Sequence, residues 1–108
     1  MSSDIQVIEP IGILDSTKAE EFRQSVEDLL QNGAETILVD LKDITFIDSS
    51  GLGTLVVLLK KIRGLNRSLC LCSINDQVRM LFELTSMDRV FEIYEDRQAF
   101  ANARLKVS

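Results

Sequence analysis

Two different repeats of hydrophobic residues alternate along this chain, and together they predict helices and strands in turn. Four segments repeat their apolar residues every three or four positions, which is the period of an amphipathic helix. They span about residues 18–31, 50–63, 76–84 and 97–105. Four shorter runs are rich in β-branched and other apolar residues, as expected of strands buried in a sheet. They span residues 5–14, 36–41, 68–74 and 90–94.

Local capping signals mark the ends of the predicted helices. Thr17 and Glu20 have the spacing of a capping box at the start of the first helix, and the Asn32-Gly33 pair ends it. Asn75 and Asp96 are predicted to cap the third and fourth helices. The third helix is expected to turn four apolar residues toward the core, namely Val78, Leu81, Phe82 and Leu84.

This order of elements predicts an α/β fold, with a mixed sheet of four or five strands and four helices mostly on one face. Residues 36–41 are expected to form a buried central strand. Residues 5–14 are interrupted by Pro10 and Gly12, which favours a hairpin or a bent edge strand, with antiparallel N-terminal strands allowed. A length of 108 residues fits a single domain over residues 1–108.

Charge and hydrophobic run lengths narrow the function classes. The net charge is −5, from 12 basic and 17 acidic residues, and the basic residues are scattered, which argues against a nucleic-acid partner. The longest run of large aliphatic residues, Leu55–Leu59, is far shorter than the ~18 residues that a membrane span needs. The N-terminus has no basic segment followed by an apolar core, so no secretory signal is predicted. We therefore expect neither a nucleic acid nor a membrane as a partner.

The two cysteines bear on the compartment. Cys70 and Cys72 are two positions apart on a predicted strand, so their side chains point to the same face about 6.6 Å apart along the chain. That separation is near the upper limit for a disulfide. Free buried thiols in a reducing compartment are the simpler interpretation, which predicts a cytoplasmic protein without a metal site.

The candidate chemistry is concentrated in the stretch FIDSSGLGTLVVLL, where a predicted strand ends and a helix begins. In parallel sheets, ligands and reacting groups gather beyond the carboxyl ends of strands. The first N–H groups of a helix are unpaired, and its dipole favours an anion there. Asp48, Ser49 and Ser50 occupy this position, and Gly51 and Gly53 allow another backbone or a ligand to approach closely.

Three ligand-binding or enzymatic interpretations fit this stretch poorly. A dinucleotide loop needs a third glycine, but Val56 occupies that place. A Ser-His-Asp triad is excluded because the chain has no histidine, and the lysines of the same helix lie roughly 16 Å from its first turn. A receiver-type phosphoaspartate needs a cluster of acidic residues for a divalent ion, which only Asp15 could join. We therefore expect no enzymatic activity and no cofactor.

Two compatible interpretations of the serines remain. A serine at a helix N-terminus can cap the helix by accepting hydrogen bonds from its first N–H groups. Such a serine is also held rigidly for a kinase, and a phosphate would add about −1.5 to −2 charges beside Asp48 and change any interface at this tip. The residues alone do not decide between cap and switch, nor between Ser49 and Ser50.

Three segments resemble the STAS-domain anti-sigma factor antagonists, small bacterial proteins that bind, and are phosphorylated by, a serine-kinase anti-sigma factor. Residues 12–22, GILDSTKAEEF, are similar to the family's G-x-L-D-x-x-x-A-x-x-L entry into the first helix. Residues 48–53, DSSGLG, match the family's D-S-S-G-L-G string, which is the most specific of the three signals. Residues 78–87 are similar to the family's third helix.

The resemblance implies a STAS fold and assigns roles to individual residues. The family's phosphoacceptor is the serine directly after the aspartate, which is Ser49 here. The family's partner-binding surface combines the loop before the first helix, the D-S-S tip and the following helix. Carried over to this chain, that surface includes Asp15, Asp48, Ser50, Gly51, Leu52 and Gly53. Asp15 is expected to approach the serine tip, which begins at Asp48, because both lie at strand-to-helix junctions on the same edge of the sheet.

The function implied by the resemblance is partner switching in transcription regulation. The unphosphorylated protein would bind a cytoplasmic anti-sigma factor kinase, which holds ATP and magnesium, and so release a sigma factor. Phosphorylation of Ser49 would weaken the binding, and a phosphoserine phosphatase would reset it. The alternative within the same fold is a STAS adaptor of a transporter or larger signalling assembly that is not phosphorylated.

Overall fold

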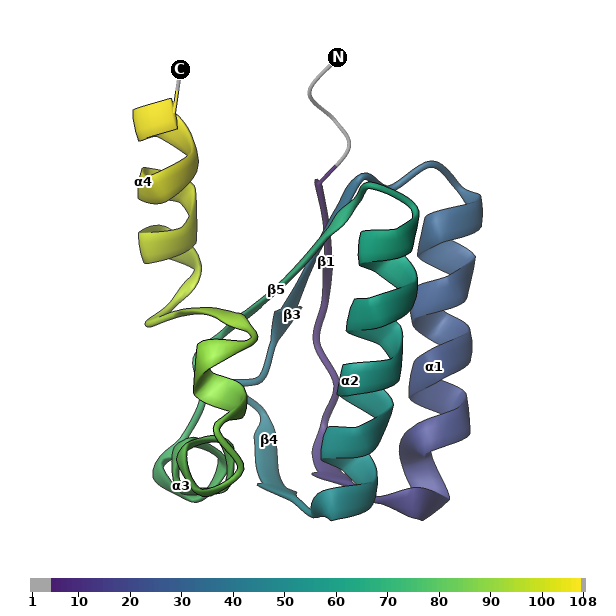
Figure 1. Cartoon of the computed structure of the whole chain (residues 1–108), viewed down its shortest axis with the longest axis vertical. Coiled ribbons are helices and arrows are strands. Elements are labelled where there is room, and N and C mark those ends of the chain that lie inside the picture. Colours follow the sequence, from purple (N-terminus) through teal and green to yellow (C-terminus); the bar gives the residue numbers. More distant parts are fainter. Residues whose placement is uncertain (1–4, 108) are drawn as a thin grey trace.

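A computed structural model describes residues 5–107 of the chain (Figure 1). The elements in chain order are β1 (Ile5–Ile8), β2 (Gly12–Leu14), α1 (Ser16–Gln31), β3 (Thr36–Asp40), β4 (Ile44–Ile47), α2 (Ser49–Gly64), β5 (Ser68–Cys72), α3 (Asp76–Leu84), the 3-10 helix η1 (Met87–Arg89), β6 (Glu92–Tyr94) and α4 (Arg97–Val107). All four predicted helices are present, so the α/β fold class is confirmed.

The strands form two sheets whose described pairs are all parallel. The larger sheet has the order β1-β3-β5-β6, and the smaller sheet pairs β2 with β4. The chain keeps its direction through the bend at Pro10, and α1 then carries it back, so β3 and β4 repeat the course of β1 and β2. The bent edge strand is therefore confirmed, whereas the hairpin and the antiparallel N-terminal pairing are wrong.

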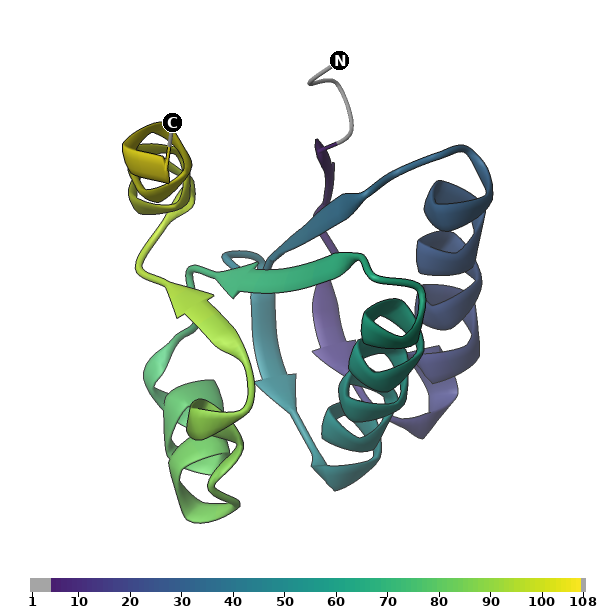
Figure 2. The same cartoon turned by 45° about the horizontal axis from the view of Figure 1, so that its top comes forward.

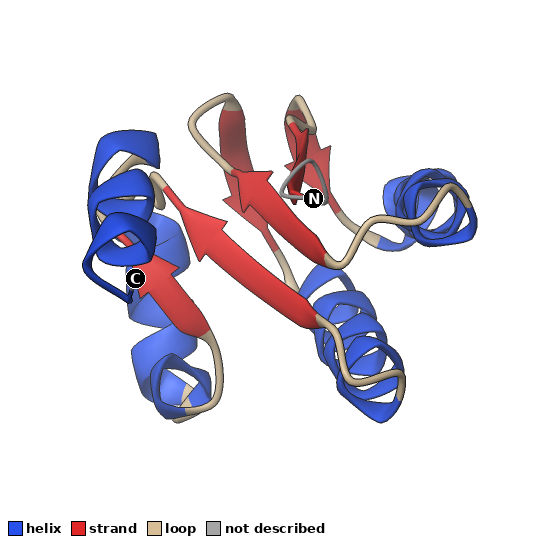
Figure 3. Cartoon of the chain, turned by 90° about the horizontal axis from the view of Figure 1, so that it is seen from above, coloured by secondary structure: helices blue, strands red, loops and turns tan. Residues whose placement is uncertain are grey.

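Three helices cover one face of the larger sheet and the fourth covers the other (Figure 3). Side chains from α1, α2 and α3, including Phe22, Leu55 and Phe82, pack against Ile37 and Val39 of β3. On the opposite face, Phe100 of α4 packs against a small cluster that contains Leu38, Cys70 and Cys72. All five residues of β3 are buried, as predicted for a central strand.

The face under α4 carries the buried polar groups of the larger sheet. Asp40 is only 1% exposed, and its carboxylate accepts a hydrogen bond from Arg97 Nε at 2.7 Å and from the Lys42 amide at 3.1 Å. Arg97 also pairs with Glu9, in the segment that joins β1 to β2. These contacts attach the start of α4 to the carboxyl end of β3.

Two details of the helices differ from the sequence prediction or extend it. Leu84 does not enter the core but is 78% exposed, because the helical repeat places it on the opposite side of α3 from the buried residues Val78 and Phe82. Asn75 caps α3 as predicted, through a bond from the Val78 amide at 2.9 Å. None of the helices within residues 5–107 is long and apolar enough to cross a membrane.

Candidate functional site

The small β2–β4 sheet brings the N-termini of α1 and α2 together. Leu14 and Ile47 are paired across this sheet, and each strand leads into a helix through an aspartate, Asp15 or Asp48. The Asp48 amide donates a hydrogen bond to the Leu14 carbonyl oxygen at 3.3 Å. The sequence-based expectation that Asp15 lies close to the serine tip is thereby confirmed, and α1 and α2 run side by side from this edge (Figure 1 and Figure 2).

Asp15 is the N-cap of α1. Its carboxylate accepts the Thr17 amide at 3.0 Å and the Thr17 hydroxyl at 2.6 Å, and the hydroxyl bond is the main cause that lowers the Asp15 pKa below its ordinary value. The predicted capping box at Thr17 and Glu20 is wrong, because the helix begins at Ser16 and Thr17 donates to the cap instead of being it. A sequence argument can find this cap from the aspartate that directly precedes the helical pattern.

Asp48 is the N-cap of α2, so neither Ser49 nor Ser50 caps this helix. Its carboxylate accepts the Gly51 amide at 2.9 Å. Of the two interpretations of the serines, the one in which Ser49 or Ser50 caps the helix is therefore wrong. Both serines are exposed in the first turn, and neither hydroxyl bonds to another group within residues 5–107. The hydroxyls thus stand at a helix N-terminus, where the dipole favours added negative charge.

The three residues after the serines divide between core and surface. Gly51 is buried against β2, and Leu52 is 6% exposed and belongs to the hydrophobic core. Gly53 is exposed and lines a groove between α1 and α2. Gly51 and Leu52 can therefore affect partner binding only by fixing the backbone conformation of the tip. The backbone of Gly53, in contrast, is accessible to a partner.

The groove beside the tip runs along the first turns of α1 and α2. Its floor and walls are small or polar, with one large apolar residue, Val57, which is 60% exposed. The lining residues are Ser16, Ala19, Arg23, Ser50, Gly53, Thr54 and Val57. The Val57 side chain points outward while its neighbour Leu58 is buried.

Two amide side chains at the start of α3 bond to the strand that leads to the tip. The sequence reasoning did not identify them as supporting groups. Gln77 Nε2 donates to the Ile47 carbonyl at 2.9 Å, and Gln77 Oε1 accepts the Ile47 amide at 3.0 Å. The Asn75 amide group donates to the carbonyl of Ile44 at 3.0 Å. On the edge of β4 that pairs with no other strand within residues 5–107, these bonds satisfy backbone groups just before Asp48. The only sequence signal for these contacts was the presence of two amide residues, Asn75 and Gln77, at the start of α3.

The surroundings of the Ser49 hydroxyl decide what chemistry this arrangement can do. Within residues 5–107 no group of acidic or cysteine side chains could hold a metal ion. No carboxylate within residues 5–107 accepts a hydrogen bond from the Ser49 hydroxyl and the chain has no histidine, so no general base is poised on that hydroxyl. The Ser49 hydroxyl is thus exposed and has no activating partner among the residues that the structure describes.

Comparisons with known proteins agree with this fold. The STAS domain family matches residues 2–100. A candidate anti-sigma factor antagonist of Thermotoga maritima is 32% identical over 93 residues, covering 85% of this chain and 82% of that protein. The anti-sigma-B factor antagonist of Staphylococcus aureus is 29% identical over 84 residues, 78% of each chain.

The solved structures include a crystal structure of a candidate anti-sigma factor antagonist from Thermotoga maritima. It superposes with a TM-score of 0.85 at 31% identity, covering 96% of this chain and 91% of that one. The resemblance stated from the sequence is confirmed by these relatives and by the family match over nearly the whole chain. The chain belongs to the STAS domain family.

Proposed function

We propose that this protein is an anti-sigma factor antagonist whose binding to a serine-kinase anti-sigma factor is switched off by phosphorylation of Ser49. The observation that carries the proposal is the exposed Ser49 hydroxyl at the N-terminus of α2, with capping assigned to Asp48. The names of the relatives support the anti-sigma factor as the class of partner. The cytoplasm, where such a kinase would meet it, is the proposed compartment.

The proposed switch works through charge at a close contact. The tip already holds two carboxylates, Asp15 and Asp48, and a phosphate on Ser49 adds about −1.5 to −2 charges beside them. Within the chain, the unpaired N–H groups and dipole of α2 tolerate this charge. Against a partner that packs on the tip, desolvated like charge costs several kcal/mol, so binding would fall by roughly 10²-fold or more.

The partner supplies the reactive components. The kinase holds ATP and magnesium, the Ser49 oxygen attacks the γ-phosphorus, the bond from that phosphorus to the β-phosphate bridging oxygen breaks, and ADP leaves. The hydroxyl proton passes to a base of the kinase, since Asp48 is occupied as a cap. A phosphoserine phosphatase restores the hydroxyl with water. In both reactions this chain is a substrate and not an enzyme.

The test uses the purified serine-kinase anti-sigma factors of the source organism with ATP and magnesium. Intact mass should show one added phosphate on the wild type and on Ser50→Ala, and none on Ser49→Ala. Ser49→Ala should still bind the kinase, whereas Ser49→Asp should bind weakly. Phosphate on Ser49→Ala would reject the site, and a kinase that binds the wild type without modifying it would favour the adaptor alternative.

A further inference from the structure

Three large apolar side chains lie exposed on and beside the small β2–β4 sheet. Ile13 is 48% exposed and Phe46 is 44% exposed, and the two are paired across the sheet. Ile11, one residue before β2, is 75% exposed. We name these three residues the apolar ridge. The next pair along the sheet, Leu14 and Ile47, is buried, because successive residues of a strand point to opposite faces.

The apolar ridge is continuous with the serine tip along both strands. Ile13 stands two residues before Asp15, and Phe46 stands two residues before Asp48 and three before Ser49. The ridge and the caps thus belong to the same edge of the molecule. A protein that reaches the Ser49 hydroxyl with its active site therefore comes within about 10 Å of the ridge, because three extended residues span no more than that.

The tip by itself is too small and too polar to hold a protein partner. A standard interface covers about 800 Å² on each side and has an apolar centre with a polar rim. The exposed residues of the tip are Ser49, Ser50 and Gly53. None of them supplies a large apolar anchor, which binding interfaces use for most of their affinity. The ridge supplies such anchors directly beside the tip.

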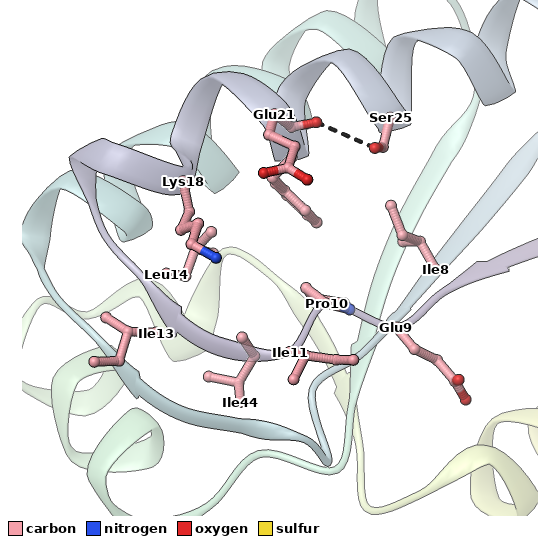
Figure 4. Close-up of a pocket in the computed structure, with 11 residues that line it drawn as sticks. Ile8, Glu9, Pro10, Ile11, Ile13, Leu14, Lys18, Glu21, Ser25 and Ile44 are labelled. Atoms are coloured by element: carbon pink, nitrogen blue, oxygen red, sulfur yellow. Dashed lines mark hydrogen bonds between the residues drawn. The ribbon is translucent and has the colours of Figure 1, made fainter.

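A groove lies next to the apolar ridge and extends this surface inward. The groove lies between α1 and the segment that joins β1 to β2, with a volume of about 310 Å³. Figure 4 shows Ile11 and Pro10 on one side and Lys18 and Glu21 of α1 on the other. Its walls include the buried residues Leu14 and Phe22. An apolar side chain of a protein laid across the ridge would fit between these walls.

We propose that the apolar ridge is the anchoring half of the surface that docks the serine-kinase partner, with the serine tip as the reacting half. The proposal rests on the proposed function and assigns the chemistry of the partner. The partner carries an apolar patch that covers Ile13 and Phe46, and a basic rim that faces Asp15 and Asp48. A basic rim also suits the net charge of −5 of this chain.

The experiment measures binding to the kinase that phosphorylates Ser49, together with the rate of phosphate transfer. Phe46→Ser and Ile13→Ser should each weaken binding by about tenfold or more and slow transfer at low concentration. Leu65→Ser is the matched control. Leu65 is 48% exposed, like Ile13, but it follows α2 at the far end of that helix, about 24 Å from Ser49. Its binding should stay within about twofold of the wild type.

Ile11→Ser is a third ridge variant, and because Ile11 lies outside the strands this substitution should leave the fold intact. Thermal unfolding shows whether each of the other variants is folded. Wild-type binding by both Phe46→Ser and Ile11→Ser would overturn the proposal while leaving the phosphorylation of Ser49 intact. Sedimentation that shows a dimer lost in the ridge variants, with kinase binding unchanged, would also overturn it in favour of a second copy as occupant. If no kinase bound or modified the wild type, the proposed function would be rejected, and the assignment of the ridge with it.

Discussion

Gly51 lies so close to the carbonyl oxygen of Leu14 that a Cβ atom on residue 51 would stand 2.2 Å from that oxygen. The same Cβ would stand 3.1 Å from Cγ2 of Ile47. Both neighbours belong to the β2–β4 pair, so the first turn of α2 rests directly on the strands that carry Asp15 and Asp48. The spacing of the two helix caps depends on the missing side chain.

We expect Gly51→Ala to destabilise the protein by roughly 1–3 kcal/mol, because the atom it meets is backbone and α2 must move to make room. Gly53→Ala is the matched control. It lies in the same helical turn with nothing within 4 Å of its Cβ, so it should stabilise the helix by up to about 1 kcal/mol. Urea unfolding measures both. Equal stability of the two variants would contradict the close contact.

The contribution of Asp48 to stability as a helix cap should be separable from that of its negative charge. Asparagine is as good an N-cap as aspartate, so Asp48→Asn should stay within about 0.5 kcal/mol of the wild type, whereas Asp48→Ala should lose about 1 kcal/mol. Denaturant unfolding gives the two values. If Asp48→Asn lost as much as Asp48→Ala, the carboxylate charge, and not the bond to the Gly51 amide, would be what holds the first turn.

Gln77 should protect the backbone of β4. Gln77→Ala leaves the amide and carbonyl of Ile47 without their partner, which we expect to cost about 2 kcal/mol. Amide hydrogen exchange at Ile47 should become faster in this variant. Gln24→Ala removes an exposed bond to Asp28 within one helix and should cost less than about 0.5 kcal/mol. A similar cost for both glutamines would mean that water replaces Gln77 at the β4 edge.

The elements could be predicted from the sequence because their signals are local. The helical period, the buried run of β3 and the caps at Asn75 and Asp96 each depend on a few neighbouring residues, and the structure confirms them. The juxtaposition of Asp15 and Asp48 also followed from local reasoning, since both residues end parallel strands at one edge.

The rest depends on contacts between distant segments. The choice of Asp48 over Ser49 or Ser50 as cap is a matter of one residue, which a pattern of several possible caps does not resolve. The role of Gln77 at β4 joins positions 30 residues apart. Ile13 and Phe46 look like core residues by type, but the small sheet leaves their face exposed.

Cys70 makes the stability of the protein sensitive to alkaline pH. The thiol is fully buried, and burial, with a further contribution from the charge of Glu92, raises the pKa of Cys70 to about 11 from an ordinary value of 9.0. Since the unfolded chain loses this proton first, the contribution of the neutral thiol is complete below pH 9 and is lost as the pH rises toward 11. A shift of this size corresponds to a loss on the order of 2 kcal/mol.

The measurement is urea unfolding of the wild type and of Cys70→Ala at pH 8 and pH 10.5. Cys70→Ala should be less stable at pH 8, because it leaves a small cavity, but it should lose less stability than the wild type on going to pH 10.5. The two proteins share every other group that could lose a proton at alkaline pH, so only the difference between the two losses reports on Cys70. Parallel losses in the two proteins would mean that the thiol ionises as readily in the folded chain as in the unfolded one, and that α4 does not keep water from this face of the sheet.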